Sequence, residues 1–272
     1  MIDTFTPQMV QAHLPSSLSC LPITILDETD STNTLARRAG EEGASHGSVF
    51  AAASQTAGRG RRGRTFSSPA GTGLYVSILL RPQMNPAHSI RITTAAAVAL
   101  CRALKSLGVS DTGIKWVNDV YRRGRKIAGI LTEASFTADG TMNYAVLGVG
   151  VNLAPPEEGF PPEIAHIAGA AWDTPPENGR ARLLAAFLRE FFILYETLAG
   201  ETALHMPEYR QRCFILGQPV TVIPTGGGEP YEAIARDIDE ECRLQIRLPD
   251  GSTDALSTGE VSLRIQSTAA EK

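Results

Sequence analysis

Residues 48–80 of the chain read SVFAAASQTAGRGRRGRTFSSPAGTGLYVSILL. The runs at 48–53 and 73–80 are apolar and bounded by turn residues, which predicts two buried strands. Between them, the segment at 58–64 combines glycine with four arginines. Glycine lets backbone N–H groups approach an anion closely, and arginine makes forked, charge-assisted hydrogen bonds to phosphate or carboxylate. The stretch therefore predicts an anion-binding loop held between two core strands.

The positive charge of this loop is local. The 272-residue chain carries 29 acidic residues against 25 Lys and Arg, a net charge of −4, yet no Asp or Glu occurs from residue 43 to residue 110. Domains that grip nucleic acid with their whole surface are usually strongly basic, so the composition argues against that class. Any contact with nucleic acid is expected to be confined to the loop.

Cysteine, histidine and hydropathy patterns exclude several further classes. The four cysteines, Cys20, Cys101, Cys213 and Cys242, are scattered, and the five histidines form neither His-Glu-x-x-His nor an i,i+4 pair. Structural or catalytic zinc therefore finds no support. No apolar run approaches the ~20 residues that span a bilayer, and residues 1–19 lack a basic n-region. We expect a cytoplasmic protein that does not enter a membrane.

The order of predicted elements indicates an α+β fold with a mixed or antiparallel sheet. The absence of Gly-x-Gly-x-x-Gly after a first strand, and of a Walker A sequence, disfavours Rossmann and P-loop enzymes. The predicted elements are a strand at 21–26, a helix at 34–39, the two core strands, a helix at 89–107, an antiparallel meander at 113–116, 126–134 and 143–153, and an amphipathic helix at 180–198.

From residue 217 the pattern changes to short alternating strands whose spacing is typical of a small barrel. These strands are predicted at 220–223, 231–237, 244–248 and 261–265. We place a domain boundary near Cys213. The expected organisation is an N-terminal extension at 1–20, a main domain at 21–212, a C-terminal barrel at 213–267 and a tail at 268–272.

Several motifs, taken in order, resemble those of biotin protein ligases, the biotin–[acetyl-CoA-carboxylase] ligase family. They are DSTN at 30–33, QTAGRGRRGR at 55–64, IKWVND at 114–119 and RKIAGIL at 125–131, and the resemblance continues through GVGVNL at 148–153 and STGEVSL at 257–263. It covers about residues 21 to 265. Single motifs carry a false-positive risk that falls when independent ones agree. The resemblance implies a class II synthetase-like catalytic domain of the biotin/lipoyl ligase type and an SH3-like C-terminal barrel.

The family joins biotin to ATP, which gives biotinyl-5′-adenylate and pyrophosphate, and then passes the biotinyl group to one lysine of a carrier domain. The resemblance therefore implies an ATP-dependent ligase that uses biotin, ATP and Mg²⁺ and acts on the carrier domain of a biotin-dependent carboxylase, with acetyl-CoA carboxylase as the expected source. A homodimer is also plausible by resemblance. The ~20 residues before the first strand are too few for a winged helix-turn-helix, so we expect no DNA binding.

Two rival functions stay open. A lipoate or octanoate ligase or transferase has a related catalytic domain, although the Arg/Gly loop and the barrel favour biotin. An RNA-binding module that uses the Arg/Gly loop predicts affinity that falls steeply with salt and needs no ATP. Beside these two, a non-catalytic binder of biotin or adenylate is a further alternative, which the presence of Arg59, Arg61 and Lys126 disfavours.

The resemblance also assigns site residues. Arg59, Arg61 and Lys126 are expected to offset the repulsion between the biotin carboxylate and the ATP phosphate, which amounts to about several kcal/mol near 4 Å in a partly desolvated site. Asp119 is the expected Mg²⁺ ligand and fourth catalytic residue. Helix capping is the alternative role for the DSTN segment, and a surface turn for Asn118 and Asp119. Biotin contacts are assigned to Ser31, Thr32, Asn33, Gln55, Arg59, Gly60, Arg61 and Lys126, and ATP or adenylate contacts to Arg61, Arg62, Arg64, Phe66, Asn118, Lys126 and Asn152.

Overall fold

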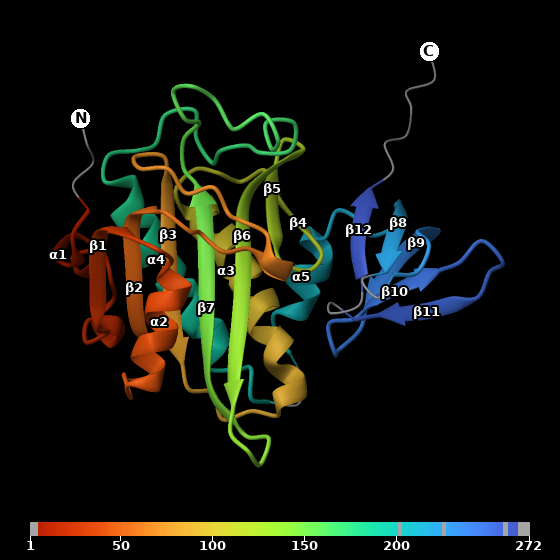
Figure 1. Cartoon of the computed structure of the whole chain (residues 1–272), viewed down its shortest axis with the longest axis horizontal. Helices are drawn as coiled ribbons and strands as arrows, with labels where there is room; N and C mark the ends of the chain where they lie inside the picture. Colours follow the sequence, from red (N-terminus) through yellow and green to blue (C-terminus); the bar gives the residue numbers. More distant parts are fainter. Residues whose placement is uncertain (1–4, 201–202, 225–226, 258–260, 266–272) are drawn as a thin grey trace.

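The computed structural model describes residues 5–200, 203–224, 227–257 and 261–265, which form two β-sheets with helices around the larger one (Figure 1). The tail at 268–272 lies outside the described residues, as does part of the motif at 257–263. No helix in the described ranges combines the length and apolar character needed to cross a bilayer.

The larger sheet has seven strands in the order β1-β2-β3-β7-β6-β5-β4. Only β1 and β2 are parallel, and every other neighbouring pair is antiparallel. The predicted mixed α+β sheet is therefore confirmed. The strands are β1 (Ile23–Thr29), β2 (Ser48–Gln55), β3 (Gly73–Leu80), β4 (Thr112–Lys115), β5 (Asp119–Arg122), β6 (Arg125–Phe136) and β7 (Met142–Asn152).

One strand of this sheet was not predicted. β5 pairs with β4 on one side and with β6 on the other, so the expected three-stranded meander has four strands. This strand is short, has a charged residue at each end and leads directly into the Arg/Gly turn at 122–125, so it showed no apolar pattern. β5 matters for function because Asp119 is its first residue.

Helices cover both faces of the larger sheet. On one face lies α2 (Thr32–Glu41), whose Ala36 packs against Leu79 and Tyr144. On the other, α3 (Ile90–Ser106) and α4 (Gly179–Tyr195) pack against each other (Figure 1). Every residue of β3 is buried. Since side chains alternate between the faces of a strand, cover on both sides explains the uninterrupted apolar run at 73–80.

Shorter helices complete this layer arrangement. The helix α1 (Pro7–Gln11) packs on α4 and brings Val10 into the main core, so the N-terminal segment contributes to the stability of the main domain. The helix α5 (Met206–Arg212) contacts α3 and β4 at the far side of the sheet. Three single 3₁₀ turns are η1 (Ser16–Leu18), η2 (Arg61–Gly63) and η3 (Pro86–Ser89).

The smaller sheet is wholly antiparallel, with the order β11-β10-β9-β8-β12. It stands beside β4 and α5 (Figure 1). The C-terminal β unit is thus confirmed, although closure into an SH3-like barrel and the boundary at 213 stay predictions. The strands are β8 (Pro219–Pro224), β9 (Tyr231–Ile238), β10 (Leu244–Arg247), β11 (Thr253–Leu256), which was not predicted, and β12 (Val261–Ile265).

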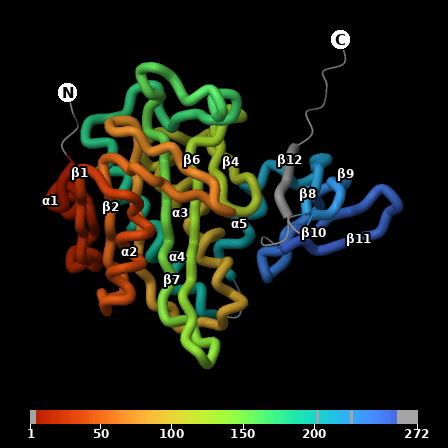
Figure 2. The backbone as a smooth tube through the Cα atoms, in the orientation of Figure 1, coloured from red at the N-terminus to blue at the C-terminus, as the bar shows by residue number. Residues whose placement is uncertain are grey.

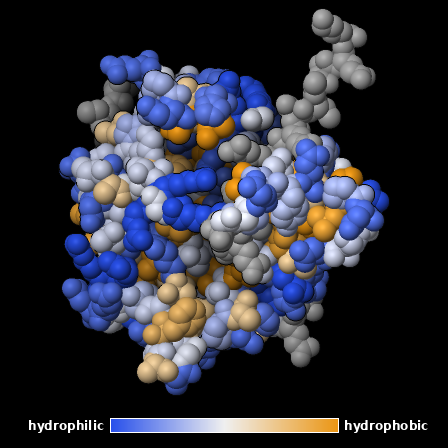
Figure 3. Space-filling view, turned by 45° about the vertical axis from the view of Figure 1, so that its right-hand side comes forward, coloured by the Kyte–Doolittle hydropathy of each residue, from blue (hydrophilic) through white to orange (hydrophobic). Residues whose placement is uncertain are grey.

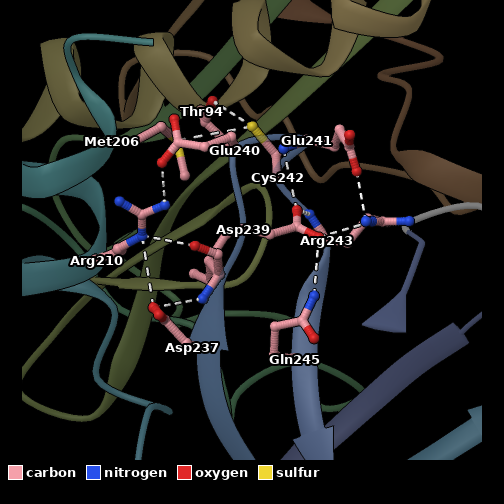
Figure 4. Close-up of polar contacts among 11 residues, drawn as sticks. Thr94, Met206, Arg210, Asp237, Asp239, Glu240, Glu241, Cys242, Arg243 and Gln245 are labelled. Atoms are coloured by element: carbon pink, nitrogen blue, oxygen red, sulfur yellow. Dashed lines mark hydrogen bonds and ion pairs between the residues drawn. The ribbon is translucent and has the colours of Figure 1, made fainter. Parts of the chain in front are cut away.

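The turn between β9 and β10 joins the two sheets (Figure 4). Cys242 is buried in this turn, with its Sγ 3.7 Å from Met206 Sδ of α5 and 3.7 Å from Thr94 Oγ1 of α3. Arg210 of α5 donates to the Ile238 carbonyl at 2.6 Å. The Trp116 indole N–H donates to the Cys242 carbonyl at 3.0 Å, so the turn also holds the IKWVND segment at 114–119.

Two long connections meet over one end of the larger sheet (Figure 2). The Arg/Gly loop runs from β2 across β7 and β6, and the connection from β7 to α4 lies beyond the ends of the strands. Backbone hydrogen bonds tie the second connection to β6, with Lys126 N donating to Ile167 O at 2.8 Å and Gly169 N donating to Lys126 O at 2.8 Å. These segments, distant in sequence, enclose the candidate site.

Candidate active site

Two adjoining cavities lie beneath the Arg/Gly loop. The larger, of about 290 Å³, is bounded by the loop, by β4 to β6 and by the connection from β7 to α4. The smaller lies between the loop, the start of α2 and the middle of β6 and β7. In a space-filling view, hydrophilic side chains gather beside a hollow between the main domain and the smaller sheet (Figure 3). The two cavities share five residues: Gly60, Arg61, Phe66, Asn118 and Lys126.

The smaller cavity collects the residues predicted to hold biotin. Ser31, Thr32 and Asn33 reach it from the start of α2, and Gln55 from the end of β2. The Gln55 side-chain oxygen accepts from the Thr32 backbone N–H at 2.9 Å and from its hydroxyl at 3.2 Å. Ser31 makes no side-chain capping bond. Helix capping by the Ser31 hydroxyl is therefore wrong, and Ser31 lines the cavity.

Arg59 also lies on the smaller cavity and not among the residues of the larger one. Its guanidinium Nη2 is 2.8 Å from Glu133 Oε1 of β6. The other oxygen of this carboxylate accepts from Asn33 Nδ2 at 2.9 Å. Sequence reasoning did not identify Glu133, because an acid within an alternating strand gives no signal of which segments it will meet.

Glycines of β7 make room for these side chains. A Cβ at Gly148 would lie 2.0 Å from Asn33 Oδ1, and one at Gly150 would lie 2.6 Å from the Phe66 ring. Glycine inside a strand often marks such a close approach. The GVGVNL motif contained this signal as two glycines at strand spacing, although the sequence analysis used it only for the resemblance.

The larger cavity collects the residues predicted for ATP. Lys126 Nζ is 2.6 Å from Asp119 Oδ1, an ionic contact without hydrogen-bond geometry. Arg61 Nη1 donates to Asn118 Oδ1 at 2.8 Å. Asn118 thus contacts an arginine. It lies in a turn at 116–118, as the alternative expected, but both Asn118 and Asp119 also line the cavity. The residues that were predicted to contact ATP or Mg²⁺ and that line this cavity are Arg61, Arg62, Arg64, Phe66, Asn118, Asp119, Lys126 and Asn152.

Positive charge dominates this region. In the described part of the chain, six basic residues and one acidic residue line the two cavities. Burial lowers the pKa of Arg61, and the nearby charge of Arg62 lowers it further. Burial likewise lowers the pKa of Lys115, which Asp119 partly opposes. Cations desolvated in this way attract phosphate or carboxylate strongly, because they have lost part of their water.

The outer wall of the larger cavity is apolar. Phe160, Ile164 and Ile167 line it from the connection between β7 and α4. An apolar wall facing charged groups suits a ligand with a flat ring system and phosphates. Sequence reasoning missed these three residues, because the connection shows only proline breaks and no period. Lys115 of β4 was part of the IKWVND motif but was assigned no role.

The residues of the larger cavity suit a Mg²⁺ ion that binds together with the phosphates of ATP. No cluster of three or more His, Cys, Asp or Glu side chains suited to a metal occurs among the described residues. Asp119 is the carboxylate on the larger cavity, and it already contacts Lys126. Mg²⁺ commonly uses one or two carboxylates and takes its other ligands from water and substrate phosphates. Asp119 as a Mg²⁺ ligand stays a prediction.

Comparisons with known proteins agree with this geometry. The model of the Biotin/lipoate A/B protein ligase family matches residues 25–152, and that of the Biotin protein ligase C terminal domain matches residues 215–264. A biotin–[acetyl-CoA-carboxylase] ligase of Paracoccus denitrificans is 35% identical over 239 residues, covering 84% of this chain and 95% of the relative. One of Mycobacterium tuberculosis is 32% identical over 243 residues, covering 87% of each chain.

A solved structure has the same fold. The biotin protein ligase of Aquifex aeolicus in complex with biotin and ATP superposes with a TM-score of 0.70 at 24% identity, covering 90% of this chain and 99% of that one. Identity at this level supports the fold alone, whereas the two curated relatives carry the family assignment. The chain belongs to the biotin protein ligase family.

Proposed function

We propose that this chain is an ATP-dependent biotin protein ligase that forms biotinyl-5′-adenylate and transfers biotin to a lysine of a carboxylase carrier domain. The observation that carries this proposal is that the two cavities adjoin and share lining residues. A small polar cavity suits the biotin head, a larger cationic cavity suits the nucleotide, and Arg61 and Lys126 border both. Relatives named biotin–[acetyl-CoA-carboxylase] ligases support acetyl-CoA carboxylase as the source of the carrier.

In the first step, a biotin carboxylate oxygen attacks the α-phosphorus of ATP. The new O–P bond forms as the bond to the β-phosphate breaks, and pyrophosphate leaves with the electron pair. Two anions must meet, so Arg61 and Lys126 lie where they offset the repulsion and stabilise the charge that grows on the phosphoryl oxygens. The Asn118 carboxamide holds Arg61 in this position. When bound, Mg²⁺ supplies further charge neutralisation on the phosphates, with Asp119 as its protein ligand.

In the second step, the carrier lysine amine attacks the acyl carbon of the adenylate. An amide bond forms, the acyl–phosphate bond breaks, AMP leaves and the ammonium formed loses a proton to solvent. The same two cations stabilise the departing phosphate. The Arg/Gly loop lies over the mixed anhydride and limits access of water until the lysine arrives.

The loop has a separate test. We expect the segment at 56–68 to be disordered without ligand and ordered with it, so biotin plus ATP slows proteolysis at Arg61 and Arg62. Cleavage of a loop-free site such as Arg37 in α2 is the reference, since α2 is a helix in the core. Equal cleavage rates with and without ligands at Arg61 would contradict a folding lid.

The lipoate or octanoate reading is less well supported, because the curated relatives and the C-terminal family model are specific to biotin. The first experiment incubates the protein with a biotin carrier domain, ATP and Mg²⁺, with lipoate and octanoate in parallel reactions. We expect transfer with biotin alone. Transfer with either fatty acid, or nucleic-acid binding that needs no ATP, would replace this proposal by one of its rivals.

Four further expectations belong to the same proposal: a cytoplasmic location, a homodimer, a lack of sequence-specific DNA binding, and biotin and ATP contacts by the residues assigned from the sequence. Sedimentation with and without biotin plus ATP tests the dimer. An electrophoretic shift assay with operator-like duplexes tests DNA binding, and a saturable, sequence-dependent shift would overturn that expectation.

A further inference from the structure

Glu133 connects the Arg/Gly loop to the segment that bears Ser31, Thr32 and Asn33. No acid occurs from residue 43 to residue 110, so the loop must find countercharge elsewhere. Glu133 of β6 supplies it, with Oε1 2.8 Å from Arg59 Nη2 and Oε2 accepting from Asn33 Nδ2 at 2.9 Å. Its side chain is 33% exposed and that of Arg59 40%, so the pair is partly screened by solvent. A single carboxylate therefore touches both segments.

The contacts continue beyond Glu133 to the other end of the loop. Asn33 Oδ1 lies 2.6 Å from the Ser77 hydroxyl, which is fully buried and also 2.8 Å from Thr32 Oγ1. Thr32 bonds Gln55, and the Gln55 Nε2 donates to Ser68 Oγ at 2.7 Å. Polar contacts thus run from Arg59 near the start of the loop, through the proposed biotin residues, to its end.

We propose that Glu133 is a positioning residue that couples closure of the Arg/Gly loop to the biotin-head segment. The inference rests on the proposed function and deepens it. The Glu133 carboxylate holds Asn33 and Arg59 in one arrangement, so a biotin head that fixes Asn33 also favours the closed position of Arg59. Arg59 then contributes through the position of the loop in addition to its proposed contact with biotin, while Arg61 and Lys126 contact the reacting phosphate.

The coupling has a measurable consequence. Glu133→Gln keeps the volume but removes the charge and replaces one of the two accepting oxygens by an NH2 donor, so Arg59 and Asn33 can no longer each donate to an oxygen of their own. We expect biotin affinity, measured by calorimetry without ATP, to fall about tenfold, which corresponds to one charge-assisted hydrogen bond. KM for biotin should rise by a similar factor while kcat falls less than threefold. Protection of Arg61 from proteolysis should need correspondingly more biotin.

A double-mutant cycle separates coupling from general structural damage. Arg59→Ala, Glu133→Ala and the double variant are compared for biotin affinity. If Glu133 acts through Arg59, the double variant binds biotin no more than threefold more weakly than the poorer single variant. The proposal would be overturned if the loss of biotin affinity in the double variant equalled the product of the losses in the two single variants. It would also be overturned if Glu133→Gln bound biotin within twofold of the wild type.

Glu208→Gln is the matched control. Glu208 also pairs with arginines, Arg102 at 2.6 Å and Arg212 at 2.8 Å, but it lies on α5 away from the cavities. We expect this variant to lose some thermal stability and to keep wild-type biotin affinity. Wild-type protein that fails to transfer biotin in the carrier assay would refute the proposed function, whereas normal transfer with additive Arg59 and Glu133 effects would refute only the coupling.

Discussion

The two cavities of the site are stabilised in different ways. The smaller is bordered on one side by short, uncharged side chains such as Thr32 and Gln55, which bond each other, and on the other by Arg59, Arg61 and Lys126. The larger is bordered by several long cations, among them Arg61, Arg62 and Lys126, and by the apolar side chains of Phe160, Ile164 and Ile167. A network of neutral groups recognises shape and hydrogen-bonding pattern, because any mismatch leaves a buried group unpaired. A cationic cavity recognises charge, which is less dependent on exact atomic position. The comparison predicts that a small change in side-chain volume weakens binding at the smaller cavity, and that removal of a positive charge weakens binding or catalysis at the larger one.

The largest effect is expected from Lys126→Ala. It removes a cation that borders both cavities and leaves Asp119 without its 2.6 Å partner. Loss of one preorganised group that stabilises developing charge typically costs about 100-fold or more in rate. We expect pyrophosphate release to fall by at least that factor. Lys126→Arg keeps the charge and should retain more activity; equal activity of the two variants would show that charge is not the relevant property.

Gly148→Ala adds one methyl group at the smaller cavity and tests how strongly biotin binding depends on its shape. Its Cβ would lie 2.0 Å from Asn33 Oδ1, so Asn33 must leave its bonds to Ser77 and Glu133. We expect calorimetry to show biotin affinity reduced more than tenfold with ATP affinity changed less than threefold. Gly179→Ala is the control, because a Cβ there would make ordinary contacts of 3.4 Å or more. Unchanged biotin affinity in Gly148→Ala would contradict the shape-dependent reading.

Phe160→Ala tests the apolar wall of the larger cavity. Phe160 lines the larger cavity together with Ile164 and Ile167, and in the proposed complex its removal would expose the adenine base of ATP to water. Complete burial of one such side chain contributes about 1.5–3 kcal/mol. Phe160 is only partly buried, so we expect KM for ATP to rise about three- to tenfold. Affinity for biotin alone should be unchanged. A larger effect on biotin than on ATP would assign Phe160 to the other cavity.

The smallest effect on activity concerns His205, which lies outside both cavities. Burial, with the charges of Arg91 and Arg102, lowers the pKa of His205 to about 4, and its Nε2 is 2.7 Å from Thr94 Oγ1. Since the unfolded chain binds this proton more readily, His205 contributes stability that is present above pH 6.5 and lost as the pH falls to about 4. The full loss is about 3 kcal/mol.

Denaturant unfolding at several pH values tests this expectation. The free energy of unfolding should fall less between pH 6.5 and pH 4 in His205→Gln than in the wild type. Biotin transfer at pH 7.5 should match the wild type once the variant is folded. An unchanged pH slope would show that another group causes the loss.

Local signals anticipated much of the fold. The apolar runs at 48–53 and 73–80 and the long helical period at 89–107 became β2, β3 and α3 within a few residues. These elements bury continuous or periodic apolar surface, which is visible in sequence. β5 (DVYR) and β11 (TDAL) were missed because each is short and begins with polar residues, beside turn signals that hide the strand pattern. Helix α2 begins where the DSTN segment indicated. However, the side-chain oxygen of Gln55, and not that of Ser31, accepts from the first backbone N–H of the helix, that of Thr32.

The sequence by itself determined the chemistry: a glycine-rich cationic loop without local acids, held between buried strands, and motifs whose order indicates the family. Only the tertiary structure decided which groups meet. Glu133 is 74 residues from Arg59 and 100 from Asn33, and Phe160 closes a cavity whose cations lie on distant segments. Composition and periodicity report burial, which depends on near neighbours along the chain. Contacts between strands depend on register and crossover, which arise when the whole sheet is assembled.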